Sequence, residues 1–142
     1  MKIIPIVAVL FMLSFNWTQA DTTQATTAST SPVAASKLEI GTRVQLAFND
    51  ARMVPVLICE SGLKQFDDDG TPKISPTSDV GIGQVNRTHW KRAKKLGLDI
   101  FNSEEDNLKM AKIIYDEQGI EAWSVYGGKC YQKNLKALNA KV

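Results

Sequence analysis

Two carboxylates carry the chemistry that this sequence suggests. The first is Glu60, which follows the apolar run Val54–Cys59. A carboxylate at the end of a buried helix is desolvated, which raises its pKa, and a helix C-terminus disfavours negative charge. A glutamic acid with a raised pKa can act as a general acid near neutral pH. A Glu60 that points outward from a frayed helix end and has no function is the alternative.

The second carboxylate is Asp79, in the segment SDVGIGQVN at 78–86. Gln84 and Asn86 are two positions apart in this segment, so in an extended chain their amides project to the same side. Paired amides can hydrogen-bond sugar hydroxyls and acetamido groups. A turn-rich hairpin with solvated amides is the alternative.

Composition excludes several other chemistries. The single histidine, His89, excludes a His-rich zinc site, and two cysteines cannot form a Cys-based zinc finger. The net charge of +2 is too small to argue for nucleic acid or an anionic membrane. Asp67–Gly70 lacks the glutamate that an EF-hand requires, so a solvated turn is predicted, with a weak metal site or a binding loop as the alternative. We therefore expect no metal and no cofactor.

The two cysteines, Cys59 and Cys130, predict a disulfide if the chain is secreted. The bond would close a loop of about 71 residues and contribute roughly 4 kcal/mol to stability. The alternative makes Cys59 a thiol nucleophile with His89 as its base.

The N-terminal region predicts export. Residues 1–20 have a short positive start, an apolar run and small residues before Ala20, as in a secretory signal peptide. The run of about 13 residues is shorter than the roughly 20 that span a bilayer. Residues 21–36 are rich in Thr, Ser and Ala, which predicts a disordered tether. The folded domain is then 37–142, and we expect a secreted, periplasmic or cell-envelope monomer without stable membrane insertion.

Hydrophobic periodicity and turn signals predict an α+β fold that is mostly α. A central irregular or β-hairpin region is expected between two helical parts. Helices are expected over 38–48, 54–61, 88–96, 103–118, 121–126 and 130–138. The basic cluster at 91–95 is predicted to be a solvated helix face, with weak attraction to an anionic polymer as the alternative.

Read in order, these segments resemble the lysozyme-like superfamily, in particular the lytic transglycosylase domain. The resemblance covers roughly 54–131. It is carried by Glu60-Ser61-Gly62, SDVGIGQVN at 78–86, Asn107-Leu108 and AWSVYGG at 122–128. Two departures stand out: Gly83 replaces a bulky residue, which would widen the groove, and Gly127 replaces an asparagine.

The resemblance implies a lysozyme-like fold and cleavage of peptidoglycan glycan strands between N-acetylmuramic acid and N-acetylglucosamine. Glu60 would be the acid and then the base of a lytic transglycosylase. Tyr126 would hydrogen-bond near it, and the predicted substrate-binding set is Ser61, Ser78, Gln84, Asn86 and Tyr126. Asp79 stands where some lysozymes have aspartate, so a hydrolytic lysozyme that uses Glu60 with Asp79 stays open. A catalytically silent glycan-binding module is the third alternative.

Overall fold

Helices dominate residues 32–140, the part of the chain that the computed structural model describes. The elements are, in order, α1 (Pro32–Phe48), α2 (Met53–Ser61), β1 (Asp79–Val80), β2 (Val85–Asn86), η1 (Arg87–His89), α3 (Trp90–Lys95), α4 (Glu104–Gln118), η2 (Ile120–Ala122) and α5 (Lys129–Asn139). The expected mostly α fold with a small β-hairpin is confirmed.

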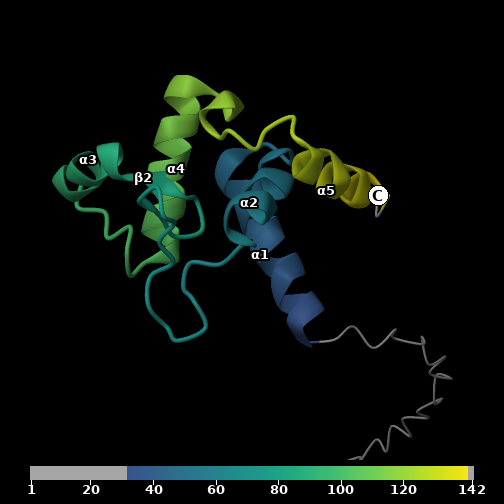
Figure 1. Ribbon diagram of the computed structural model, residues 1–142, viewed down its shortest axis with the longest axis horizontal. Helices are drawn as coiled ribbons and strands as arrows, with labels where there is room; N and C mark the ends of the chain where they lie inside the picture. Colours follow the sequence, from purple (N-terminus) through teal and green to yellow (C-terminus); the bar gives the residue numbers. More distant parts are fainter. Residues whose placement is uncertain (1–31, 141–142) are drawn as a thin grey trace, which may run out of the picture.

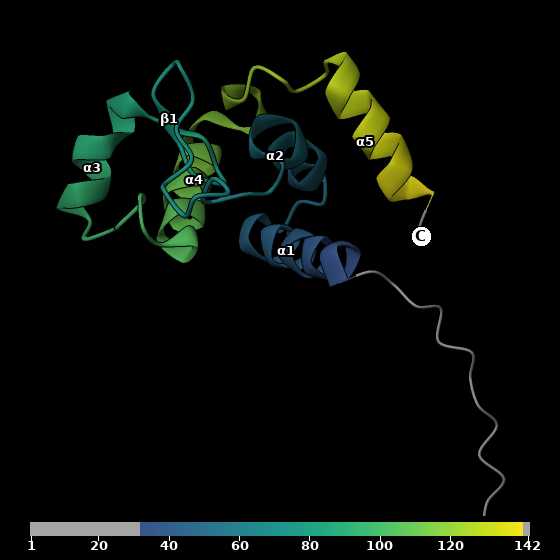
Figure 2. The ribbon, with the colours of Figure 1, turned by 60° about the horizontal axis from the view of Figure 1, so that its bottom comes forward.

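The helices α2 and α4 form the centre of the molecule, and α1 packs against both (Figure 1). In both ribbon views α3 and α5 lie at opposite ends, with α5 beside α2 (Figures 1 and 2). The strands lie between α3 and α2, in front of α4 in Figure 1. This arrangement brings the ends of α2, the hairpin and α4 to one region.

The buried helix α2 agrees with the prediction made from its apolar run. Its residues 53–57 are all buried, as expected for a helix that is apolar on every side. Gly62 ends the helix in the left-handed conformation, with φ 68°, where glycine carries no steric penalty. Glu60 therefore occupies the last turn of a buried helix.

The long helix α4 supplies the opposite wall of the core. Its N-cap is Ser103, whose hydroxyl accepts from the Asp106 N–H at 3.2 Å. The Asp106 carboxylate instead accepts from the Asp99 N–H at 3.0 Å, so the capping box is only half formed. An apolar face of α4 places Leu108, Ala111 and Ile114 in the core.

Two predicted boundaries are wrong. The structure begins α1 at Pro32, so the helix includes the last five positions of the predicted tether (32–36). Proline suits the first turn of a helix because its missing N–H costs nothing there. The predicted helix over 121–126 is only the short η2, because Trp123 takes an extended backbone (φ −100°, ψ 113°). The predicted signal peptide and residues 21–31 lie outside the described residues.

Cys59 and Cys130 form the predicted disulfide. The bond joins α2 to the first turn of α5, and Tyr131 is buried beside it. Because both sulfur atoms are bonded, the alternative of a Cys59 nucleophile is wrong. The covalent link ties α5 to the last turn of α2, the turn that also carries Glu60.

Candidate active site

A cleft of about 260 Å³ brings the predicted site residues together. Its walls come from the end of α2, the β-hairpin, η1, the C-terminal half of α4 and the segment after η2. Its lining residues are Glu60, Asp79, Gln84, Asn86, His89, Ile114, Gln118, Ala122, Trp123 and Ser124. Four residues that the sequence singled out for chemistry therefore share one cleft.

Glu60 is half-buried, and its surroundings favour the protonated form. Burial raises the pKa of its carboxyl above the ordinary 4.5, and the nearby negative charge of Asp79 raises the pKa further. The backbone N–H of Val125 acts in the opposite direction without reversing the shift. A carboxyl group that stays protonated above its ordinary range can donate a proton.

Asp79 has the opposite character in the same cleft. Its carboxylate accepts hydrogen bonds from the Ser75 hydroxyl at 2.8 Å, the Asn86 amide at 2.7 Å and the Thr77 hydroxyl. Burial acts to raise the pKa of Asp79, but the bonds from Thr77, Asn86 and Ser75 outweigh it and hold the pKa below its ordinary 3.8. Asp79 is thereby kept ionised beside a Glu60 that resists ionisation.

Gln84 and Asn86 line the cleft, but not from the extended chain that the sequence predicted. Gln84 has φ 47° and lies in the turn between the strands, so the chain from 84 to 86 is not extended. Its amide donates to the Gly81 carbonyl at 2.8 Å, whereas Asn86 binds Asp79 and caps η1 through the Thr88 N–H. Both residues line the cleft, but the alternation argument that placed them together is wrong.

Two buried amides hold the turn that carries Gln84. The Gln65 side chain accepts from the Ile82 N–H at 3.0 Å and donates to the carbonyls of Ile100 and Phe101. The Asn107 side chain accepts from the Gly83 N–H at 2.8 Å and donates to the carbonyls of Val80 and Ile100. These bonds satisfy buried backbone groups that the short strands leave unpaired.

Gly81 and Gly83 are required by this packing. A Cβ at Gly81, which has φ 74°, would lie 2.3 Å from Gln65 Oε1. At Gly83 a Cβ would meet the Ala111 Cβ at 2.7 Å. The expectation that Gly83 widens the substrate-binding cleft is therefore wrong. A side chain at this position would point at α4 and not into the cleft.

The predicted substrate-binding residues Ser61 and Ser78 form hydrogen bonds within the protein. Ser61 is buried, and its hydroxyl donates to the Ile82 carbonyl at 2.8 Å. Ser78, with φ 67°, closes a turn with Ser75, and its carbonyl accepts from Arg87 N–H. Neither serine lines the cleft. Their assignment to substrate binding stays a prediction.

Tyr126 faces the disulfide side of the molecule. Its ring packs edge-on against Tyr131 of α5, with ring centroids 4.9 Å apart. Among the described residues no hydrogen bond joins Tyr126 to Glu60. The Val125 N–H provides the contact to Glu60 that the resemblance assigned to Tyr126.

The acidic loop at 67–69 is engaged by its own neighbours. Asp67 pairs with Lys73 at 3.0 Å, Asp68 with Lys64 at 2.7 Å, and Asp69 accepts from the Thr71 N–H at 2.9 Å. Within residues 32–140, no three His, Cys, Asp or Glu side chains are grouped to hold a metal ion. The loop is thus an ion-paired turn.

Sequence reasoning missed two lining residues of the cleft, Gln118 and Ser124. They come from separate segments, and no local spacing joins them. His89, which the sequence offered as the base for a Cys59 nucleophile, lines the cleft too. Trp123 also lines the cleft, and its indole N–H donates to the Gly83 carbonyl at 2.9 Å. Its place in the segment AWSVYGG was the only signal that could have indicated this role.

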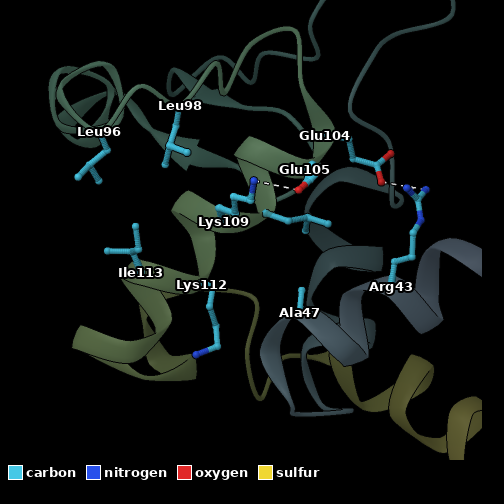
Figure 3. A pocket seen from close by; sticks show the side chains of 10 residues that line it. Arg43, Ala47, Leu96, Leu98, Glu104, Glu105, Lys109, Lys112 and Ile113 are labelled. Carbon is cyan, nitrogen blue, oxygen red and sulfur yellow. Dashed lines mark ion pairs between the residues drawn. The ribbon is translucent and has the colours of Figure 1, made fainter.

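A second hollow, the apolar groove, is larger, at about 730 Å³. It is lined by Arg43, Ala47, Leu96, Leu98, Glu104, Glu105, Leu108, Lys109, Lys112 and Ile113. Figure 3 shows Leu96, Leu98 and Ile113 on one side of the groove and the Arg43–Glu104 ion pair on the other. None of the predicted site residues lines it.

Two further observations complete the description. None of the helices in residues 32–140 combines the length and apolar character that crossing a membrane requires. Comparisons with models of protein families, with curated proteins and with solved structures found no match for the chain. The resemblance to the lysozyme-like superfamily therefore rests on the motifs at 60–62, 78–86, 107–108 and 122–128.

Proposed function

We propose that this protein is a lytic transglycosylase that cleaves the β-1,4 bond between N-acetylmuramic acid and N-acetylglucosamine in peptidoglycan. One observation carries the proposal: two carboxylates of opposite character share a cleft, with the pKa of Glu60 raised and that of Asp79 lowered. Such a split is the pattern expected of an acid and an anion that act together in one site. The motif resemblance supplies the substrate class.

In this mechanism Glu60 is the catalytic acid and then the base. Its carboxyl group donates a proton to the glycosidic oxygen as the bond to the leaving sugar breaks. The C6 hydroxyl of the muramic residue then attacks the anomeric carbon, and Glu60 takes up the hydroxyl proton. The products are a new sugar hydroxyl and a 1,6-anhydro-muramyl end. The ionised Asp79 stabilises the positive charge that develops on the sugar ring.

A hydrolytic lysozyme is the second candidate, because Asp79 lies in the same cleft as Glu60. In a retaining hydrolase the second carboxylate forms a glycosyl-enzyme intermediate, which water then cleaves. Asp79 is ionised and hydrogen-bonded, as that role requires. In this candidate the Asp79 carboxylate attacks the anomeric carbon, whereas in the first candidate the C6 hydroxyl of the muramic residue does.

The proposal extends to fold and setting. A helical part joined to a small β-hairpin part, with the acid at the end of a buried helix between them, supports a lysozyme-like fold. An exported monomer that meets peptidoglycan in the cell envelope fits the expected signal peptide and the disulfide.

Mass spectrometry of a peptidoglycan digest, made in water labelled with heavy oxygen, tests the proposal. Transglycosylation predicts unlabelled anhydro-muramyl products, lighter by one water than hydrolytic ones. Labelled reducing ends would assign the hydrolase instead. Intact glycan recovered after long incubation would overturn both candidates, and the variant Glu60→Gln is the control for contaminating activity.

A further inference from the structure

His89 is the cleft residue that the proposed mechanism does not use. It ends η1, is partly buried, and lines the cleft together with Glu60 and Asp79. Among residues 32–140 its imidazole makes no hydrogen bond to another side chain or to the backbone. A residue that lines the cleft thus keeps a ring N–H donor without a protein partner, whichever protonation state the ring has.

His89 is also the only lining residue that can carry positive charge. The other polar lining residues are two carboxylates, three amides and one hydroxyl. The acidic neighbour of His89 is Glu117, and this carboxylate is already bound by Arg92, with Nη1 to Oε2 at 2.6 Å. A ligand carboxylate would thus meet a donor at His89 and repulsion at the ionised Asp79.

The polar lining of the cleft is divided between its walls. His89 lies on the η1 wall, whereas Glu60 and Asp79 lie on the α2 and β1 walls. A substrate that carries both a sugar backbone and a carboxylate is oriented by such a division between a donor and two carboxyl groups.

We propose that His89 is a specificity-determining residue that binds a carboxylate of the glycan substrate. The inference rests on the proposed function for its substrate class. In peptidoglycan the carboxylate comes from one of two sources, the free lactyl group of a muramic residue or the stem peptide attached to it. Binding there places the sugar backbone against Glu60 and separates muramic from plain N-acetylglucosamine polymers.

Calorimetric titration in the Glu60→Gln background tests this assignment, because no cleavage is expected there. The ligands are a peptide-free muramic tetrasaccharide, the same glycan with its lactyl carboxylates converted to methylamides, and a stem-bearing glycan. We expect the free carboxylate to bind about tenfold more tightly than the methylamide, the ratio expected for one charge-assisted hydrogen bond. A His89→Ala substitution removes this ratio and His89→Lys restores it, whereas the exposed Lys91→Ala, a matched control, leaves it unchanged.

The outcomes separate the inference from the proposed function. Weaker binding of only the stem-bearing glycan by His89→Ala assigns the peptide carboxylate as the ligand. Equal ratios with and without His89, for every glycan, would overturn the inference, as would the absence of any binding. Cleavage by the Glu60→Gln variant would instead overturn the role of Glu60, while the binding ratio would still decide the role of His89.

Discussion

The polar cleft and the apolar groove are both lined by α4, but they differ in whether their charged residues form ion pairs. In the groove each charged lining residue has a partner of opposite sign: Arg43 pairs with Glu104, Lys109 with Glu105, and Lys112 with Asp116. In the cleft, among the described residues, Glu60 and Asp79 have no cationic partner. The cleft is the smaller hollow, about 260 Å³ against about 730 Å³.

This difference supports the proposal that the cleft, and not the groove, is the catalytic site. Paired surface charges are solvated and contribute little, and an apolar hollow by itself offers no group that can transfer a proton. Carboxylates whose pKa values are pushed apart are characteristic of active sites. Variants in both hollows can therefore test whether unpaired charge, and not volume, marks the site.

The largest effect is expected for Glu60→Gln. Loss of a general acid reduces kcat by about 10²- to 10⁴-fold, because glutamine cannot donate a proton to the glycosidic oxygen. The matched change in the groove is Glu105→Gln, which breaks only an exposed pair with Lys109. Turnover of peptidoglycan measures both, and equal activity of the two variants would remove the distinction between the hollows.

Asn107→Leu should have the next largest effect. It leaves the Gly83 N–H and the carbonyls of Val80 and Ile100 without their partners, at a cost of about 3 kcal/mol or more. Urea unfolding measures this loss, and Asn139→Leu on the exposed end of α5 is the control. A variant as stable as the control would show that the buried amide does not hold the turn.

A smaller effect is expected for Asp79→Asn. If Asp79 only stabilises charge, kcat falls about tenfold, equivalent to roughly 1.4 kcal/mol. Activity is lost as pH rises through the Glu60 pKa, and removal of the Asp79 charge lowers that pKa. The alkaline limb of the pH–rate profile should therefore move to lower pH. A limb that does not move would show that the two carboxylates are not coupled.

The smallest effect belongs to Leu96→Gln. Leu96 lines the groove and is 52% exposed, so its replacement should change stability by no more than about 0.5 kcal/mol. Because the groove has no role in the proposed chemistry, kcat/KM should not change. A marked loss of cleavage by this variant would connect the groove to catalysis.

Sequence predicted the features that depend on neighbouring residues. The burial of α2 and its end at residue 61 depend on neighbouring residues, so the chain itself indicates them. Glu60 was found because it follows an apolar helix. The pairing of Cys59 with Cys130 followed from their number and the expected compartment.

The features that sequence missed depend on contacts between distant segments. Gln65 and Asn107 are unremarkable in the chain, and only the fold places both amides on the 80–83 turn. Gln84 reaches the cleft through a left-handed turn conformation that the alternation argument excludes. Gln118 shares the cleft with Glu60 only because the fold brings the end of α4 to the end of α2.

Titration of the two carboxyl groups by carbon-detected NMR tests the central claim most directly. We expect Glu60 to titrate above 4.5 and Asp79 below 3.8, because burial and the Asp79 charge oppose ionisation of Glu60 whereas three hydrogen bonds favour ionisation of Asp79. In Asp79→Asn the Glu60 midpoint should fall toward 4.5. Ordinary pKa values for both groups, unchanged by that substitution, would contradict the assignment of Glu60 as the acid and Asp79 as the anion of this cleft.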